Sequence, residues 1–484
     1  MNSFSKFSEI REGYRSKKFS PVEVTQFYLD QIKKSKHNAY LDICEDRVLD
    51  QAKKVEKIIF SDKDAFEKYP LLGMPMGIKD LLNIDGVKTT CASKMLENYV
   101  APYTATCVER LEKAGALSLG KLNLDEFAMG SSNENSAFGP VEHPTHPERV
   151  PGGSSGGSAT AVGADLCLTS LGTDTGGSIR LPASFCGVVG YKPTYGRVSR
   201  FGVVAFASSL DQVGPFAKTV EDAALVAEVM SGKDIYDSTS SSESVGAWSS
   251  EISKPMDWKS LKVGVPKEYF VEGVEDSVRK SVEESLRWFE SKGATLVDIS
   301  LPHTEYAVST YYVVAVSEAS SNLARFDGVR FGTRPDGANE SATLDEFYEK
   351  VRSQFGAEVK RRIILGTYAL SSGYYDAYYS KACKVRRLIR NDFDEAFKKV
   401  DVIAGPVAPT VAFKRGAMLE NPLQMYLMDI FTIPASLSGL PALSVPCGTQ
   451  EDGLSIGLHL IGSPFADEKV LKVAHHFQKE RYHG

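Results

Sequence analysis

Apolar residues recur at helical spacing in several separate parts of this chain. The clearest helix is predicted to begin at residue 21, because Ser20 to Glu23 forms a capping box with proline at the first helical position. Three more helices are predicted over residues 106–115, 275–291 and 374–398. Short apolar runs that suit strands lie between these helices. They cover residues 116–119, 166–171 and 261–265.

Strands that alternate with helices predict an α/β fold in which helices cover a β-sheet. Two polar stretches interrupt this pattern, a Ser- and Glu-rich one at 237–253 and another at 328–342. The first is either a linker between domains or a surface loop within one core. A length of 484 residues allows about three domains, although large α/β enzymes often use such a length for a single core.

Composition excludes several classes of protein. With 42% apolar and 24% charged residues, the chain has ordinary globular usage. A net charge of −6 disfavours a chain that grips a nucleic acid by itself, because such a face is normally basic. If a nucleic acid is involved, we expect another subunit to hold most of it. The seven cysteines are never spaced as CxxC, which argues against a disulfide framework and a zinc site.

Neither a membrane segment nor a signal peptide is expected. Residues 1–7 are polar and lack the apolar centre of a signal peptide. The chain also contains no uninterrupted run of about 18 apolar residues. The sequence therefore predicts a cytoplasmic protein that does not bind a membrane.

Three glycine-rich segments are candidates for chemistry. The first, Gly115 to Leu122, nearly fits the phosphate-binding loop GxxxxGK[ST]. However, Leu122 lacks the hydroxyl that binds Mg²⁺, and the segment follows a predicted helix where the loop needs a preceding strand. We therefore expect no nucleotide site there.

The second segment, Gly152 to Ser158, contains GxSxG with Ser154 at its centre. This pattern allows a nucleophile elbow, although a Gly/Ser run is more often a flexible loop. Here it leads into the small residues 159–164, which suit a helix packed very close to its neighbours. A glycine loop that opens a helix also presents free N–H groups to an oxyanion.

The third segment, Gly172 to Arg180, follows the predicted strand 166–171 and precedes a predicted short helix. Its glycines at 176 and 177 let the backbone approach a substrate and point successive N–H groups inward. Ser178 then stands where an exposed nucleophile would be placed. The alternative is that Ser178 only caps the helix.

A serine nucleophile needs a base. None of the eight histidines lies where a predicted strand ends in a turn. Lysine can serve instead if burial removes its charge, because desolvation lowers the pKa of lysine. Lys79 is the best candidate, since it stands in the apolar stretch 73–82, where a solvated lysine would be out of place. The alternative is that Lys79 pairs with Asp80 or extends to the surface.

Together these segments resemble the amidase signature family. Residues 152–158, 170–183 and 187–194 match its glycine- and serine-rich blocks, and Gly77 to Asp80 matches its lysine block. The similarity extends over nearly the whole chain to one branch, the A subunits of tRNA-dependent amidotransferases. That branch is indicated by residues 123–140, 318–328 and 370–379.

The resemblance implies a mixed, twisted central β-sheet covered by helices on both faces. It also implies a single domain over residues 1–484, with the catalytic core at about 70–220. The loop-rich segment at about 231–256 would then lie inside this domain.

The family's catalytic triad implies roles for three residues. Ser178 would be the nucleophile, Lys79 the neutral base, and Ser154, held by a cis peptide bond, the proton relay. This reverses the interpretation of Ser154 from GxSxG alone. The oxyanion hole would be formed by the backbone N–H groups of Thr175, Gly176, Gly177 and Ser178.

The resemblance also implies how the substrate glutamine is held. Arg362 would bind its α-carboxylate and Asp429 its α-ammonium, since an arginine fork suits a carboxylate and a carboxylate suits an ammonium. Tyr312, Gly130 and Ser131 are further candidates for lining the pocket.

The implied reaction is hydrolysis of glutamine to release ammonia. A B subunit would use the ammonia to amidate Glu-tRNA(Gln), Asp-tRNA(Asn) or both, and a small C subunit would complete a heterotrimer. No cofactor or metal is expected in this chain, whereas the B subunit would use ATP and Mg²⁺ and would hold most of the tRNA.

Three alternatives stay open. The chain could be a stand-alone amidase of the same family that acts on another small amide. It could be a Ser-His-Asp hydrolase that uses Ser154, or a catalytically silent scaffold for partner subunits.

Overall fold

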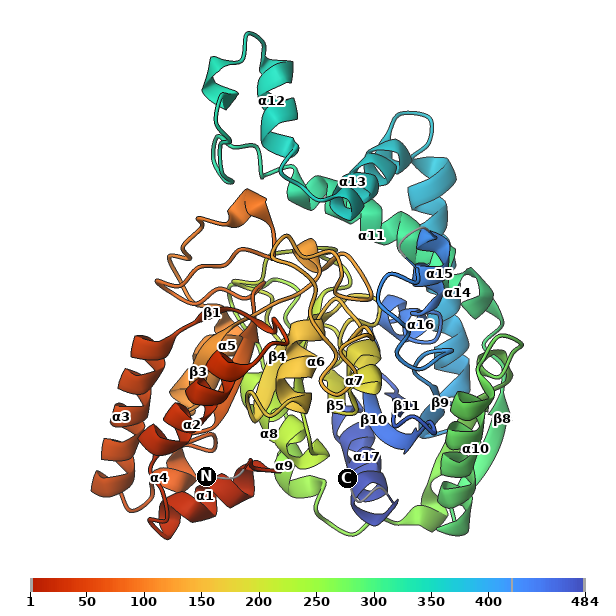
Figure 1. Cartoon of the computed structure of the whole chain (residues 1–484). Coiled ribbons are helices and arrows are strands. Elements are labelled where there is room, and N and C mark those ends of the chain that lie inside the picture. Colours follow the sequence, from red (N-terminus) through yellow and green to blue (C-terminus); the bar gives the residue numbers. More distant parts are fainter. Residues whose placement is uncertain (1–2, 419–420, 482–484) are drawn as a thin grey trace.

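One large mixed β-sheet forms the centre of the molecule (Figure 1). The computed structural model describes residues 3–418 and 421–481, so parts of the polar N-terminal stretch and of the predicted single domain lie outside it. Within the described residues the sheet has eleven strands in the order β1-β3-β2-β4-β6-β5-β10-β11-β9-β7-β8. The strands are β1 Tyr40–Ile43, β2 Pro75–Lys79, β3 Leu117–Leu122, β4 Thr169–Asp174, β5 Val189–Lys192, β6 Gln212–Ala217, β7 Lys262–Pro266, β8 Thr295–Ile299, β9 Val402–Pro406, β10 Ala442–Thr449 and β11 Ser455–Gly462.

Parallel and antiparallel pairs both occur in this sheet. Strand β2 runs parallel to β3 and β4, and β7 runs parallel to β8 and β9. The pairs between these two groups, from β4 and β6 to β11 and β9, are antiparallel. The prediction of an α/β fold with a mixed sheet is confirmed.

Helices connect the strands and surround the sheet. None of them, within the described ranges, is long and apolar enough to cross a membrane. The helices are α1 Phe7–Arg15, α2 Pro21–Lys34, α3 Glu45–Ser61, α4 Ala65–Lys68, α5 Thr106–Lys113, α6 Gly156–Gly163, α7 Arg180–Cys186, α8 Val220–Met230, α9 Trp248–Glu251, α10 Asp276–Ser291, α11 Ala307–Leu323, α12 Leu344–Arg352, α13 Ala357–Leu370, α14 Lys381–Ala396, α15 Pro422–Leu427, α16 Ile433–Leu437 and α17 Asp467–Arg481.

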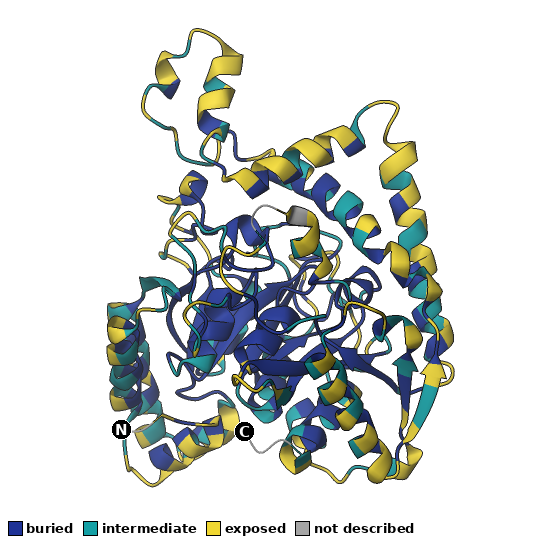
Figure 2. Cartoon of the chain, turned by 45° about the vertical axis from the view of Figure 1, so that its right-hand side comes forward, coloured by how far each residue is buried: buried dark blue, intermediate teal, exposed yellow. Residues whose placement is uncertain are grey.

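Both faces of the sheet are covered, as two neighbouring residues of β5 demonstrate. A side chain at Gly190 would meet Ala183 of α7, whereas the Tyr191 hydroxyl donates to Asp467 of α17 at 2.6 Å. Successive residues of a strand point to opposite faces, so α7 and α17 lie on opposite sides of the sheet. Figure 2 shows the buried residues concentrated in the sheet and the helices next to it.

Three of the four predicted helices agree with the observed ones except at their ends, and the fourth is divided. At the start of α2, Ser20 Oγ accepts the N–H of Glu23 at 3.2 Å and Glu23 accepts the N–H of Ser20 at 2.8 Å, which confirms the capping box. Thr106 does not cap α5, because its hydroxyl donates to Asp234 at 2.6 Å. The helix predicted over 374–398 is divided into a π-helical turn at Asp376–Ser380 and α14.

The strand predicted over 166–171 is displaced toward the turn that carries Ser178. Strand β4 begins only at Thr169, because the N–H of Leu166 donates to the carbonyl of Ala161 at 2.8 Å and completes the turn after α6. The strand then extends to Asp174, which directly precedes the segment that carries Ser178.

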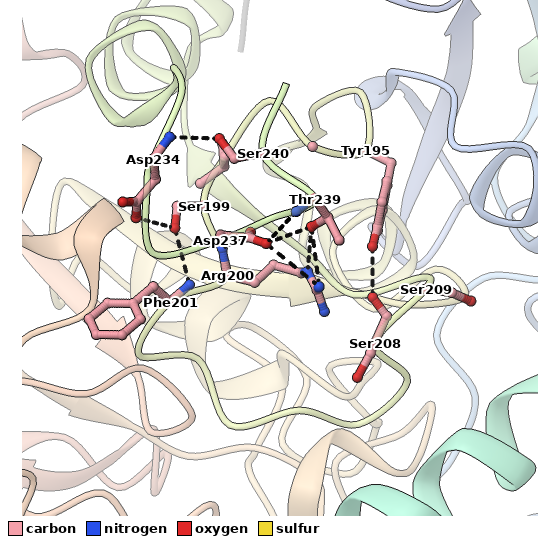
Figure 3. A network of polar contacts seen from close by, with 12 residues as sticks. Tyr195, Ser199, Arg200, Phe201, Ser208, Ser209, Asp234, Asp237, Thr239 and Ser240 are labelled. Carbon is pink, nitrogen blue, oxygen red and sulfur yellow. Dashed lines mark hydrogen bonds and ion pairs between the residues drawn. The ribbon is translucent and has the colours of Figure 1, made fainter. Parts of the chain in front are cut away.

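The polar stretch predicted over 237–253 packs against the molecule and contains the short helix α9. Asp237 accepts the backbone N–H of Arg200 at 2.8 Å, and Thr239 Oγ1 accepts from the Arg200 guanidinium at 3.2 Å (Figure 3). Asp234 accepts the Ser199 hydroxyl at 2.6 Å. These contacts attach the stretch to the loop that follows β5.

Helix α6 needs its small residues. Every residue from Gly156 to Val162 is buried. A side chain at Gly157 would overlap the backbone oxygen of Asn123, which belongs to the segment after β3. The predicted close packing of this helix is confirmed.

We therefore expect Gly157→Ala to destabilise the protein by more than about 2 kcal/mol, because the added methyl meets immovable backbone. Gly163→Ala, at the end of the same helix, meets mainly the Pro144 ring at 3.0 Å and is the matched control. Thermal unfolding measures both variants. Equal melting temperatures for the two would contradict the packing argument.

Candidate active site

Lys79 ends strand β2 and is completely buried. Its ammonium nitrogen Nζ lies 3.0 Å from Ser154 Oγ, 2.8 Å from Ser155 Oγ and 2.8 Å from Thr173 Oγ1. Three hydroxyl groups therefore surround the amine. The sequence indicated Ser154, but Ser155 and Thr173 were missed as partners, because neither position alone reveals where its side chain points.

The charge of Lys79 is not balanced by a carboxylate. Among the described residues none lies within ion-pair distance of Nζ. Burial lowers the pKa of Lys79 to about 7, although the more distant Asp125, Asp211 and Asp174 oppose this shift. A large fraction of Lys79 is therefore an uncharged amine at neutral pH.

The alternative that Lys79 pairs with Asp80 is wrong. Asp80 instead forms an ion pair with Lys121 at 2.7 Å, and both side chains are buried. Lys121 also donates to the carbonyl of Lys88 at 3.0 Å and to Thr89 Oγ1 at 2.8 Å. The lysine of the segment Gly115 to Leu122 is thus used inside the protein.

Ser154 follows a cis peptide bond, Gly153–Ser154, as the resemblance implied. The carbonyl of Ser154 accepts the N–H of Asp125 at 3.1 Å. A side chain at Gly153 would collide with the Asp125 carboxylate, so only glycine fits there. Asp125 also accepts the N–H groups of Asn133 at 2.9 Å and Asn135 at 3.0 Å. Reasoning from the sequence did not single out Asp125. Its place in the segment 123–140, which carries the family resemblance, was the available signal.

Ser178 lies in the turn between β4 and α7 and is 9% exposed. Its hydroxyl makes no hydrogen bond with any described residue. The alternative that Ser178 caps α7 is wrong, because Ile179 occupies the N-cap and its N–H donates to Asp174 at 3.2 Å. The Ser178 hydroxyl is consequently free to react.

The backbone before Ser178 has the character of an anion-binding turn. None of the N–H groups from Thr175 to Ser178 donates to a described residue, so four consecutive donors are unused. A side chain at Gly176 would lie 2.8 Å from the Tyr311 ring, and one at Gly177 would lie 2.5 Å from Asp429 Oδ1. Glycine at both positions lets this turn lie against its neighbours.

A buried ion pair joins the two ends of the turn that carries Ser178. Asp174 accepts from Arg180 through both of its oxygens at 2.9 Å. Arg180 also donates to the carbonyl of Thr432 at 3.0 Å and contacts His459 Nε2 at 3.0 Å. This pair fixes the nucleophile turn to the segment that carries Asp429.

Asp429 lies beside the nucleophile turn with one oxygen unused. Its Oδ2 accepts the Ser131 hydroxyl at 2.5 Å, whereas Oδ1 is buried without a hydrogen-bond partner among the described residues. Burial raises the pKa of Asp429 to about 7. A cationic group would supply the missing partner and favour the ionised carboxylate.

Arg362 is buried on α13 among aromatic rings. Its guanidinium carbon lies 5.3 Å from the Tyr312 ring centre, 5.7 Å from that of Tyr426 and 5.5 Å from that of Phe206. Only its Nε is bound, to Glu358 at 2.8 Å, and its two terminal nitrogens have no partner among the described residues. That fork matches a carboxylate.

Two residues that support Arg362 were missed in the sequence. Glu358 stands one helical turn before Arg362, and the Tyr426 hydroxyl donates to it at 3.0 Å. Tyr426 also stacks on Tyr312 with ring centres 3.8 Å apart. The spacing of Glu358 and Arg362 was the available signal. Tyr426 had none, since it approaches from another part of the chain.

The candidates for substrate binding form two groups. Ser131, Asp429 and the nucleophile turn contact one another, whereas Arg362 and Tyr312 face each other on α13 and α11. Gly130 lies against the Asp125 carboxyl and supports the loop that carries Ser131. Ser154 has Lys79 as its hydrogen-bond partner and no histidine, so the Ser-His-Asp alternative lacks its base.

No cluster of three or more His, Cys, Asp or Glu side chains that could hold a metal ion occurs in residues 3–418 and 421–481. The family model for amidases matches residues 23–471.

The chain belongs to the amidase family.

Other members are close to this amidase in sequence. It is 58% identical over 440 residues to the A subunit of glutamyl-tRNA(Gln) amidotransferase from Koribacter versatilis, covering 90% of each chain. Identity to the corresponding A subunit from Desulfatibacillum aliphaticivorans is 52% over 475 residues, covering 97% of this chain and 96% of the relative. The crystal structure of the Thermotoga maritima A subunit is 43% identical, with a TM-score of 0.78, and covers 95% of this chain and 92% of that chain.

If Lys79 is the base, the rate of amide cleavage should depend on pH. We expect the rate of amide cleavage to rise with pH through a midpoint at about 7, because the protonated form of Lys79, which predominates below this pH, cannot accept a proton. Single-turnover rates from about pH 5.5 to about pH 9 measure this. A flat profile, or a midpoint near the ordinary pKa of lysine, would contradict it.

A second expectation concerns Glu358. Glu358→Gln should raise the KM for an α-carboxylate substrate about tenfold, because the Arg362 fork loses its charged partner, and should leave kcat within about threefold. Glu283→Gln is the control, since Glu283 stands at the same spacing from Arg287 on the surface of α10. Steady-state kinetics of both variants measure the changes in KM and kcat. A change in kcat alone would show that Glu358 does not act through substrate binding.

Proposed function

We propose that this chain is the glutaminase subunit of a tRNA-dependent amidotransferase. It hydrolyses glutamine and supplies ammonia for converting Glu-tRNA(Gln), Asp-tRNA(Asn) or both into the amidated tRNA. The proposal is supported by the identity of 52–58% to proteins named as the A subunit of glutamyl-tRNA(Gln) amidotransferase, over nearly their full length.

One observation carries the chemistry, namely a buried lysine surrounded by hydroxyl groups without a carboxylate partner. A lysine in that state accepts a proton at neutral pH, which an ordinary surface lysine cannot do. Ser154 touches this amine at 3.0 Å, and Ser178 stands free beside four unused N–H groups. A base, a relay, a nucleophile and anion-binding donors are the parts that acyl transfer requires.

In the proposed mechanism, Lys79 takes a proton from Ser154 while Ser154 takes the proton of Ser178. The Ser178 oxygen attacks the amide carbon of glutamine, and the resulting oxyanion is held by the N–H groups of residues 175–178. The C–N bond then breaks as the proton returns to nitrogen, and ammonia leaves. Water hydrolyses the γ-glutamyl ester on Ser178 by the same proton path and releases glutamate.

Glutamine would be recognised through both charged groups on its α-carbon. The free fork of Arg362 would bind the α-carboxylate, and Tyr312 would pack beside it. Asp429, oriented by Ser131, would bind the α-ammonium with its unused oxygen. These two charges would leave only the side-chain amide within reach of Ser178.

The remaining parts of the reaction are assigned to other subunits. The proposed B subunit uses ATP and Mg²⁺, holds most of the mischarged tRNA and receives the ammonia, and a C subunit completes the heterotrimer in the cytoplasm. The net charge of −6 supports a chain that does not hold a tRNA by itself. We also propose that residues 1–484 form one domain with its catalytic core at about 70–220.

Trapping the acyl-enzyme tests this function. After reaction with an electrophilic glutamine analogue, we expect mass spectrometry to find the adduct on the peptide that contains Ser178. The matched variant Ser178→Ala should carry no adduct, and the assembled enzyme containing it should release no ammonia from glutamine. Ammonia or ammonium added from outside should restore tRNA amidation in that assembly.

The outcome separates the alternatives. An adduct on Ser154 in the Ser178→Ala variant would identify Ser154 as the nucleophile. Broad hydrolysis of unrelated small amides by the isolated chain, at rates above that for glutamine, would favour a stand-alone amidase. Unchanged ammonia release from the Ser178→Ala assembly would leave this chain as a scaffold.

A further inference from the structure

Thr175 is the first donor of the nucleophile turn, and its side chain has a partner of its own. The residue is 1% exposed, and its hydroxyl donates to Asp211 Oδ1 at 2.7 Å. Because the N–H of the same residue is free, this bond fixes the position of one of the four anion-binding donors. Neither Lys79 nor Ser154 touches Asp211.

The second oxygen of Asp211 leads toward the substrate-binding arginine. Oδ2 accepts the N–H groups of Phe206 at 2.9 Å and Ala207 at 3.0 Å. The centre of the Phe206 ring lies 5.5 Å from the Arg362 guanidinium. One buried carboxylate therefore joins the turn that would hold the oxyanion to the ring on which Arg362 rests.

The segment between Phe206 and Asp211 is hydrogen-bonded to α11 and to Tyr195. Glu318 of α11 accepts the N–H of Ser209 at 2.8 Å and its hydroxyl at 2.6 Å. Asn322, one turn further along α11, donates to the carbonyl of Phe206 at 3.1 Å. The Tyr195 hydroxyl donates to the carbonyl of Ser208 at 2.8 Å (Figure 3). The loop that carries Asp211 is thus attached to α11, the helix that also carries Tyr312 beside Arg362.

We infer that Thr175 and Asp211 form a positioning link between the α-carboxylate site at Arg362 and the oxyanion donors. The inference rests on the proposed function, since it takes Arg362 as the carboxylate-binding residue. When a carboxylate fixes the guanidinium, the Phe206 ring beneath it, and through Asp211 the Thr175 backbone, are fixed as well. Binding energy from a remote group is then expressed in kcat instead of KM.

Two amides and two variants test the link in the assembled enzyme. The substrates are glutamine and 4-aminobutanamide, which is glutamine without its α-carboxylate. Thr175→Val keeps the shape and removes the hydroxyl, whereas Thr175→Ser keeps the hydroxyl. Thr106→Val is the matched control, because the Thr106 hydroxyl donates to the Asp234 carboxylate at 2.6 Å at the start of α5.

For Thr175→Val we expect kcat with glutamine to fall about 30-fold with KM changed less than about threefold, because a small displacement of a catalytic group costs this much. With 4-aminobutanamide, kcat should fall at least about threefold less than with glutamine, because the oxyanion donor is displaced for both amides but the link is engaged only by glutamine. Thr175→Ser should remain close to the unmodified enzyme, and Thr106→Val should lower only the melting temperature.

Other outcomes overturn the link. An equal fall of kcat for both amides would mean a general defect of the oxyanion turn, and a change confined to KM would mean a role in binding. If Thr175→Val does not fold, the unmodified enzyme still decides, because equal kcat values for the two amides contradict the coupling. An enzyme that hydrolyses 4-aminobutanamide but no glutamine would overturn the proposed function itself.

Discussion

The site depends on an amine kept away from both water and negative charge. Burial disfavours the ammonium form of Lys79, and three hydroxyl groups satisfy its hydrogen bonds without compensating its charge. The nearest carboxylate in the sequence, Asp80, would reverse this effect if it paired with Lys79. Adjacent residues at the end of β2 point to opposite sides, and Lys121 neutralises Asp80 there. The ion pair with Lys121 therefore holds the Asp80 carboxylate in a contact other than one with Lys79.

Three other buried carboxylates lie near enough to Lys79 to raise its pKa. Each of them also binds a loop. Asp125 holds the turn at 133–135, Asp174 closes the nucleophile turn with Arg180, and Asp211 holds Thr175. Their charges raise the pKa of Lys79 partly back toward its ordinary value, and burial outweighs them. Loop positioning and tuning of the base are therefore coupled. A substitution that removes one of these carboxylates displaces a loop and also lowers the pKa of the lysine, so its two effects on rate need separate measurements.

The sequence indicated the reacting groups better than their surroundings. Ser178, Ser154 and Lys79 stand in segments where glycine runs or an apolar context make the residue conspicuous. Ser155 and Thr173 lie in the same glycine-rich segments, but the sequence does not show that their side chains point toward Lys79. Asp211 and Tyr426 carry no such signal, because their importance arises only when parts of the chain that are distant in sequence come together. The same limit applies to the fold. The capping box of α2 is a local feature and was predicted correctly, whereas β4 moved by three residues because a turn after α6 uses Leu166. Strands β10 and β11, which pair with each other in the sheet, were not recognised.

The proposed glutamine site is unbalanced in charge, and this imbalance constrains its ligand. Asp429 is buried with one oxygen unpaired. Burial raises its pKa to about 7, so part of the population is protonated when no ligand is bound. Arg362 is different, because Glu358 binds only its Nε and two of its nitrogens remain available. A ligand with a carboxylate alone would satisfy Arg362 and leave the Asp429 oxygen unpaired, which is costly in a buried site. A ligand with an ammonium alone would leave the Arg362 fork unfilled. A zwitterion compensates both groups at once, and in the proposed function it is the α-amino acid end of glutamine that does so. Selection for the amino acid then arises from unsatisfied groups in the protein rather than from close fit around the side-chain amide.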